Sequence, residues 1–545
     1  MKKVTFLLLM LIITCPNIFS ATPSEVYSDS KMLVVCHEKF KTAMEPFVLH
    51  KNELGLKTDM IVIQYMDEDS LQTYINDYVD KHADLKFLLL VGDVDYVPYH
   101  YFIGKGVTGA TDHYYNSRVQ GCDFIPGRFS CETLAEAKAM VTRSILYDHM
   151  RQDQAWGKNA LVIGSNNIYS DYMGEKAGVN IPDYEFAARI GEMLKEVGLD
   201  PTVLVDKDTI NLMDNTNVIK AINNGCSCVN YTGHGGTDRW VTSNFTTEDA
   251  LNLKNANKWP FIFSTACVSG NYIDTCLSEA FLRARDADGY PTGAVACYAS
   301  SANQPFGFPM VAQESFNKFW TEGEYVTFGE LCENAARSMY EVDGSAGYTH
   351  TTWNIFGDPS LIVYPYNGQI TPSELTMSTG IKGGEYDFYA YDKIDASNPI
   401  SDNADVEYHA NSVKLTDGFK FSGKHLLVSS DIDLSLPTIS IGGGWRSVLS
   451  NETQSELTDL ADNSSEEMAA PRIFPIPSNG LITADFGNAD GEKTIVITDM
   501  NGKIVYQNRF GDKRVDINLS ALQSGVYTAR ITTSQMSVIK SIILK

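Results

Sequence analysis

Two short stretches decide the fold of this 545-residue chain: VNYTGHGGTDRW at residues 229–240 and FIFSTACVSGNY at residues 261–272. Each is an apolar run that ends in small residues around one reactive side chain, His234 in the first and Cys267 in the second. A short apolar run bounded by glycine is typical of a buried strand. Two readings follow: either the strand ends bring a thiol and an imidazole together, or both strands belong only to the core.

The surrounding sequence alternates strands with helices, which predicts an α/β fold between about residues 30 and 365. Continuous apolar strands separated by amphipathic helical segments, such as 38–55 and 132–148, indicate a parallel sheet covered on both faces. Sites in such sheets form at the carboxyl ends of the strands, where His234 and Cys267 stand. The expected strands are KMLVV (31–35), MIVIQY (60–65), KFLLLVGD (86–93), KNALVIGS (158–165), PTVLVD (201–206), CSCVNYTG (226–233), WPFIFSTA (259–266) and GAVACYAS (293–300).

The N-terminus predicts an exported protein. MKKVTFLLLMLIITCPNIFSA has two lysines, an apolar run and small residues near Ser20, which is the pattern of a secretory signal peptide over residues 1–20. No later segment reaches the roughly 18 apolar residues of a membrane-spanning helix, so we expect no integral membrane segment in the mature chain. A net charge of −25 argues against nucleic acid as a partner.

The sequence changes character after WNIFGDPSLIVYP (353–365), and this sets the expected domains. Residues 451–470 hold six acidic residues and no basic one, which is typical of a solvated linker. The last segments alternate apolar and polar residues, with an Asn-Gly turn in DMNGK (499–503), as in a small antiparallel β-sandwich. No tandem repeat is apparent. The expected divisions are an N-terminal α/β subdomain (21–155), a catalytic subdomain (156–365), a β-rich spacer (366–448), an acidic linker (449–470) and the sandwich (471–545).

The cysteines and glycines indicate thiol chemistry. Ten cysteines become nine when Cys15 leaves with the signal peptide, and an odd number suggests a free thiol. A nucleophilic thiol needs a nearby imidazole and backbone N–H groups aimed at the developing oxyanion. His234 supplies the imidazole, while Gly235 and Gly236 allow close backbone approach and the N–H of Cys267 is a further donor. No cluster of His and Cys has zinc-like spacing, and no metal ligand is predicted.

At this point the chain resembles the gingipain family of caspase-like cysteine peptidases. The similarity runs in family order over about residues 30–365 and includes PFVLHKNELGLKTDMIVI, LLLVGDVDYVP, IPGRFSCET, YTGHGG, ACVSGNY, SSANQPFGFPMVAQE and FGDPSL. The resemblance implies a caspase-like domain and endopeptidase activity on proteins or peptides. It also implies Cys267 as the nucleophile and His234 as the general base and acid.

The same resemblance suggests three further site residues, each with an alternative. An orienting acid is expected after ALVIGS, but Asn166 stands there, and Asn167 and Asp171 compete with it. Asp183 would be the acidic residue of a pocket for Arg or Lys, or else a helix N-cap. Phe306 would be an aromatic pocket wall, or else a loop residue packed on the core.

The tail resembles a second family, the type IX secretion sorting domains. IFPIPSNGLI (473–482), IVITDMNGKIVYQ, INLSALQSGVYTARI and the terminal lysines carry this similarity. It implies the type IX machinery as a partner and a secreted or surface-associated product. The resemblance implies that the reaction requires no cofactor. A structural calcium ion remains an open alternative, and GATDH (109–113) is one acidic loop, although no EF-hand pattern is present.

Two rival functions remain open at this stage. One is a sorting-type peptidase or transpeptidase that processes other exported proteins. The other is a catalytically inactive surface-binding protein on the same fold, which the amide at Asn166 keeps in consideration.

Overall fold

The computed structural model describes residue 27 and residues 30–429 and 472–544, apart from short gaps. The gaps are at 105, 117–123, 152–153, 168–177, 208–209, 212–213, 306, 343–346, 364–370, 475–479, 487–492, 499–502, 524 and 534–536. The predicted signal peptide and acidic linker lie outside the described residues. The chain forms two compact units, residues 1–447 and 448–545.

An eleven-stranded sheet forms the centre of the first unit, in the order β2-β1-β3-β6-β16-β15-β14-β10-β7-β8-β9. All eight predicted strands are present in it, and the sheet continues across the expected boundary at residue 155. The strands are β1 (Lys31–His37), β2 (Lys57–Ile63), β3 (Leu85–Val91), β6 (Ile125–Phe129), β7 (Asn159–Gly164), β8 (Asp200–Lys207), β9 (Ile210–Asn211), β10 (Cys228–Thr232), β14 (Phe261–Thr265), β15 (Ala296–Ser300) and β16 (Trp353–Phe356).

The sheet is mixed, which corrects the expectation of a parallel sheet throughout. β15 and β16 pair antiparallel at its middle, while β16 and β6 pair parallel. The half that contains β1 and β3 therefore runs opposite to the half that contains β10 and β14. Because a site forms where carboxyl ends of neighbouring strands meet, only one half directs its strand ends to the edge that carries His234 and Cys267.

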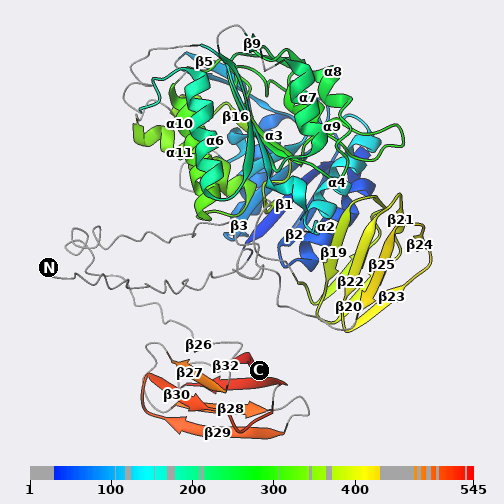
Figure 1. Ribbon diagram of the computed structural model, residues 1–545, viewed down its shortest axis with the longest axis vertical. Coiled ribbons are helices and arrows are strands. Elements are labelled where there is room, and N and C mark those ends of the chain that lie inside the picture. Colours follow the sequence, from blue (N-terminus) through cyan, green and yellow to red (C-terminus); the bar gives the residue numbers. More distant parts are fainter. Residues whose placement is uncertain are drawn as a thin grey trace, which may run out of the picture. The chain divides into compact units, whose positions relative to one another are not determined.

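Helices cover the sheet on both sides, as predicted, with α6, α10 and α11 on one side and α7 and α9 on the other (Figure 1). The capping box at the start of α4 is formed by Thr133 and Glu136, which satisfy free N–H groups of its first turn. The helices are α2 (Lys41–Glu53), α3 (Glu68–Val79), α4 (Leu134–Tyr147), α6 (Asp183–Glu196), α7 (Asn215–Asn224), α8 (Thr247–Leu251), α9 (Leu277–Arg283), α10 (Gly307–Glu322), α11 (Phe328–Val342) and α12 (Gly347–His350).

Strand β6 is absent from the predicted set because Pro126 and Gly127 make IPGRF look like a turn. Its Arg128 is completely buried and forms two hydrogen bonds with Asp112, from Nε at 2.9 Å and from Nη2 at 2.6 Å. The same guanidinium donates to the carbonyls of Gly92 and Val97. The carboxylate in GATDH therefore binds an arginine, so the calcium alternative gains no support at this loop.

Residues 374–429 form a three-coil parallel β-solenoid, which the sequence predicted only as a β-rich spacer without repeats. Equivalent strands of successive coils pair in parallel and build three small sheets. The coils repeat every 19–21 residues, as in the ladder from Glu374 to Lys393 to Ser412. The strands are β17 (Glu374–Met377), β18 (Ile381–Lys382), β19 (Glu385–Tyr389), β20 (Lys393–Ala396), β21 (Pro399–Ser401), β22 (Asp405–His409), β23 (Ser412–Leu415), β24 (Lys420–Phe421) and β25 (His425–Ser429).

The solenoid packs on the α/β domain and shares its hydrophobic core. Apolar side chains such as Phe388 and Tyr408 belong to the same buried cluster as the central sheet. Arg151 contacts Asp387 at 2.8 Å, and Lys382 contacts Asp286 at 2.9 Å. The spacer is thus part of the first unit rather than a loose connection.

The second unit contains two antiparallel sheets, β26-β27-β30 and β29-β28-β31-β32, as predicted for a sandwich. The strands are β26 (Arg472–Phe474), β27 (Leu481–Asp485), β28 (Lys493–Thr498), β29 (Ile504–Phe510), β30 (Arg514–Asn518), β31 (Gly525–Thr532) and β32 (Ser537–Leu544). Its apolar core, which includes Ile495, Ile497 and Ile531, is separate from that of the first unit. Among the described helices of the whole chain, none has the length and apolarity needed to cross a membrane.

Candidate active site

His234 and Cys267 follow neighbouring strands at the same distance. β10 and β14 pair in parallel, and their last residues, Thr232 and Thr265, stand opposite each other. Each candidate residue lies two positions beyond this pair. His234 is exposed, and Cys267 is partly buried. The sheet therefore places both residues at one edge, as the first of the two readings requires, and their pairing as a dyad stays a prediction.

Gly235 is the point of closest approach between the two loops. A Cβ added to Gly235 would lie 2.8 Å from the Cβ of Ala266 and 3.0 Å from the backbone nitrogen of Cys267. Such distances are too short for carbon, so this position requires glycine. A Cβ added to Gly236 would have its nearest neighbour, Asp238 Oδ1, at 3.4 Å. Gly235 is thus closely packed whereas Gly236 is not, and the segment packed against Gly235 is the Cys267 loop.

The turn that holds Cys267 contains a conformation that the sequence did not reveal. Val268 has a positive φ of 48°, which is unusual for a β-branched residue. It is held there by a hydrogen bond from its N–H to the Ala302 carbonyl at 3.0 Å. Gln304, from the following loop, points its backbone N–H at the Cys267 sulfur at 3.4 Å. Backbone outliers of this kind often occur at functional sites.

The thiol of Cys267 is distinguished from the other described cysteines by its exposure. All eight described cysteines are free. The odd number of cysteines in the mature chain predicted at least one free thiol. Seven of the eight are buried. Burial raises the pKa of the Cys228 thiol well above its ordinary value, and the same holds for Cys276. Such thiols are inert, so Cys267 is the one described thiol open to a substrate.

The candidates for the orienting residue lie after β7. Asn166 is exposed and makes no hydrogen bond among the described residues. Asn167 is partly buried and donates to Ser165 Oγ from its side chain at 2.7 Å, while its carbonyl accepts from the N–H of Asp183 at 3.0 Å. Asp171 lies outside the described residues. The orienting role of Asn166 stays a prediction.

Asp183 lies beneath this loop and is almost completely buried. It is the first residue of α6, whose N-cap is Pro182 without a side-chain hydrogen bond, so Asp183 is not the cap itself. One carboxylate oxygen accepts from the Ser165 hydroxyl, and the other is buried without a hydrogen-bond partner among the described residues. Burial raises the pKa of Asp183 to about 7, despite the opposing hydrogen bond from Ser165. Phe306 lies outside the described residues.

The sheet with these two strand ends points to the class of cysteine peptidases, and the comparisons identify the family. The pattern of peptidase family C25 matches residues 26–364, and the chain belongs to this family. The pattern of the secretion system C-terminal sorting domain matches residues 472–545. The protein is accordingly a cysteine endopeptidase of the gingipain type that carries a type IX sorting domain, and it is secreted or associated with the cell surface.

Individual relatives agree with this assignment. Gingipain R2 of Porphyromonas gingivalis is 29% identical over 549 residues, which cover 96% of this chain and 69% of the relative. Gingipain R1 of the same organism is 31% identical over 420 residues, or 72% of this chain and 41% of the relative. The crystal structure of the Arg-specific cysteine proteinase gingipain R has the same fold, with a TM-score of 0.57 at 24% identity over 96% of this chain and 100% of that one. Peptidases of this type need no cofactor for the reaction.

Proposed function

We propose that the chain hydrolyses peptide bonds after a basic residue through a Cys267–His234 dyad. The observation that carries this proposal is the register of β10 and β14, which sets both residues two positions beyond paired strand ends. The mixed sheet supports it as well, because this half of the sheet is the one whose carboxyl ends meet at that edge.

In the proposed reaction His234 takes the thiol proton, and the Cys267 sulfur attacks the carbonyl carbon of the substrate. The N–H of Cys267 has no hydrogen-bond partner among the described residues, so it is free to donate to the oxyanion. His234 then gives its proton to the leaving amine, which breaks the peptide bond and leaves an acyl-enzyme. Water, activated by the same imidazole, releases the second product and restores the thiol.

Asp183 supports the preference for a basic residue. A buried carboxylate oxygen without a partner is costly, and a guanidinium or ammonium group of a substrate would supply the missing hydrogen bond and charge. Gingipain R, whose fold this chain shares, is an Arg-specific cysteine proteinase, which favours arginine. The sorting domain would pass the protein to the type IX secretion machinery, its second proposed partner.

Cleavage of a diverse peptide library by the mature protein tests this function. We expect cleavage after Arg or Lys, loss of all cleavage in Cys267→Ala, and a loss of at least 100-fold in kcat/KM in His234→Ala. Cleavage that persists in Cys267→Ala would refute the dyad. Intact peptides with the unmodified protein would favour the surface-binding alternative, and joined rather than hydrolysed products would favour the transpeptidase.

A further inference from the structure

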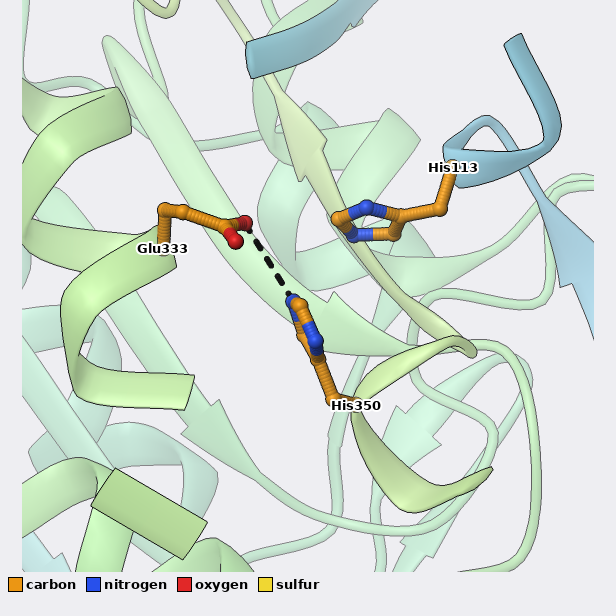
Figure 2. Close-up of side chains that lie close together, drawn as sticks. All are labelled: His113, Glu333 and His350. Atoms are coloured by element: carbon orange, nitrogen blue, oxygen red, sulfur yellow. Dashed lines mark ion pairs between the residues drawn. The ribbon is translucent and has the colours of Figure 1, made fainter. Parts of the chain in front are cut away.

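Three side chains from distant parts of the sequence converge away from the proposed dyad. His113 begins a short 3-10 helix (His113–Asn116) after β5 (Val107–Thr111), Glu333 lies in α11 and His350 ends α12. Figure 2 shows the three side chains pointing toward one another. One possible ligand atom from each lies within 4.8 Å of the other two. The proposed peptidase reaction uses none of them.

The geometry of this cluster matches what a metal site requires. His350 Nε2 lies 3.3 Å from Glu333 Oε2, yet it is buried and forms no hydrogen bond among the described residues. Neighbouring ligands of a tetrahedral zinc ion with bonds of 2.0–2.1 Å are about 3.4 Å apart, so this pair already has the required separation. His113 would have to approach by at most about 1.4 Å, the difference between the 4.8 Å limit and this separation.

His113 is also held as a ligand histidine is usually held. Its Nε2 lies 2.9 Å from the Trp353 carbonyl oxygen, and this contact fixes the orientation of the ring. Such a hydrogen bond to a backbone carbonyl orients metal-binding histidines in many proteins.

The simpler alternative is an ion pair without a metal. In that state a protonated His350 faces Glu333, whose other oxygen lies 3.3 Å from Arg337 Nε. An ion pair explains Glu333 and His350 but gives no role to the second imidazole beside them. Two imidazoles and one carboxylate are a ligand set suited to zinc and related divalent ions.

We propose that His113, Glu333 and His350 bind one divalent transition-metal ion of the zinc class, with water in the fourth position. The ion would connect the loop after β5 to α11 and α12 around the first residue of β16. That residue, Trp353, donates from Nε1 to Gln304 Oε1 at 2.9 Å, and Gln304 is the residue whose N–H faces the Cys267 sulfur. The ion would thus stabilise the support of the Cys267 loop.

Calorimetric titration of the full chain with Zn²⁺ at pH 7.5 tests the proposal. Cys267→Ala serves as the parent protein, because it removes the accessible thiol that would also bind zinc. We expect one ion per chain, a higher unfolding temperature with zinc, and at least a 100-fold loss of affinity in His350→Gln and in Glu333→Gln. His425→Gln is the matched control, since His425 belongs to the other described cluster of this kind, with Asp405 and Glu407; it should retain the parent affinity.

Absence of binding, equal binding in the parent and His350→Gln, or loss of binding in His425→Gln would each overturn the proposal. Circular dichroism checks that every variant is folded. If His350→Gln does not fold, the parent titrated with Co²⁺ decides: visible bands of tetrahedral cobalt without a thiolate charge-transfer band support the site. A thiolate band, or the spectrum of free cobalt, refutes it. His113→Gln should abolish the bands.

Discussion

At the scale of single residues, Gly235 shows how the two loops of the site depend on each other. Its missing side chain allows the His234 loop to lie against the backbone of Cys267. The sequence predicts a glycine that admits a substrate carbonyl, whereas in the structure Gly235 lies closest to the loop of Cys267.

Gly235→Ala should therefore reduce kcat/KM by about 100-fold or more, because displacements near 1 Å at a reacting centre have effects of this size. Gly236→Ala, which has room for its Cβ, should lose less than about tenfold by the same reasoning. Steady-state kinetics on one arginine peptide measures both variants. Equal losses would mean that backbone freedom, rather than the contact with Cys267, matters at these positions.

Asp183 predicts a pH dependence in the binding of basic substrates. Its pKa of about 7 means that the carboxyl is mostly protonated below pH 7, whereas a cation needs the ionised form. The Kd of an arginine peptide for Cys267→Ala protein should then rise about tenfold for each pH unit below 7. In Cys267→Ala/Asp183→Asn binding should be weak and independent of pH between 5 and 8.

The stability of the fold should depend on pH in the opposite direction to the binding of basic substrates. A carboxyl with a raised folded pKa stabilises the protein fully below its unfolded pKa of about 3.9 and loses that contribution as the pH rises through 7. Asp183→Asn should therefore raise the unfolding temperature at pH 8 and have little effect at pH 4. Thermal unfolding of both proteins at pH 4 and pH 8 measures these changes. Equal changes in the unfolding temperature at the two pH values would contradict the prediction.

At the scale of elements, Lys51 joins three segments that are distant in sequence. From α2 it reaches Asp148 at the end of α4 and Asp358 after β16, each at 2.9 Å, and all three side chains are at most 2% exposed. This lysine explains why PFVLHKNELG and FGDPSL belong together in the fold.

Lys51→Met should lower the free energy of unfolding by about 3–5 kcal/mol, because it leaves two carboxylates buried without their cation. The exposed pair of Lys41 and Glu45, at 3.9 Å, offers a control, and Lys41→Met should change the free energy by less than about 0.5 kcal/mol. Urea unfolding monitored by tryptophan fluorescence compares them. Similar effects for both lysines would contradict the structural role of Lys51.

At the scale of the whole molecule, the two units have separate hydrophobic cores, while the solenoid shares the core of the catalytic unit. Removal of residues 472–545 should therefore leave kcat/KM within about twofold, because the first unit keeps its own complete core. The same removal in the producing cell should prevent export, since the sorting domain is absent.

Deletion of residues 374–429 is the informative contrast. It removes Phe388 and Tyr408 from the common core and should give insoluble or inactive protein. Activity and solubility of the two shortened chains are measured side by side. A fully active chain without the solenoid would show that the shared core is not needed for the catalytic fold.

The sequence predicted the elements because periodicity and capping are local. Eight strands, the helices α2 and α4 and the sandwich could be located from runs of apolar residues, whereas the two longest helices, α10 and α11, were not predicted. Strand β6 could not, because Pro126 and Gly127 are turn formers whose burial depends on neighbours far along the chain. The solenoid was missed because its coils share a spacing of side chains rather than a repeated sequence.

The sequence by itself determined the strands that precede His234 and Cys267 and made these two side chains the candidates for the reaction, since GHGG and TACVSG each lie within a few residues of their strand. Only the tertiary structure decided which strand ends face the same edge, how Val268 is strained beside Cys267, and that His113, Glu333 and His350 meet. The reason is physical. A strand forms from neighbours in sequence, whereas the shared edge joins His234 to Cys267, 33 residues later, and the three-residue cluster joins His113 to Glu333, 220 residues later. The spacing of these residues in the sequence carries no trace of either contact.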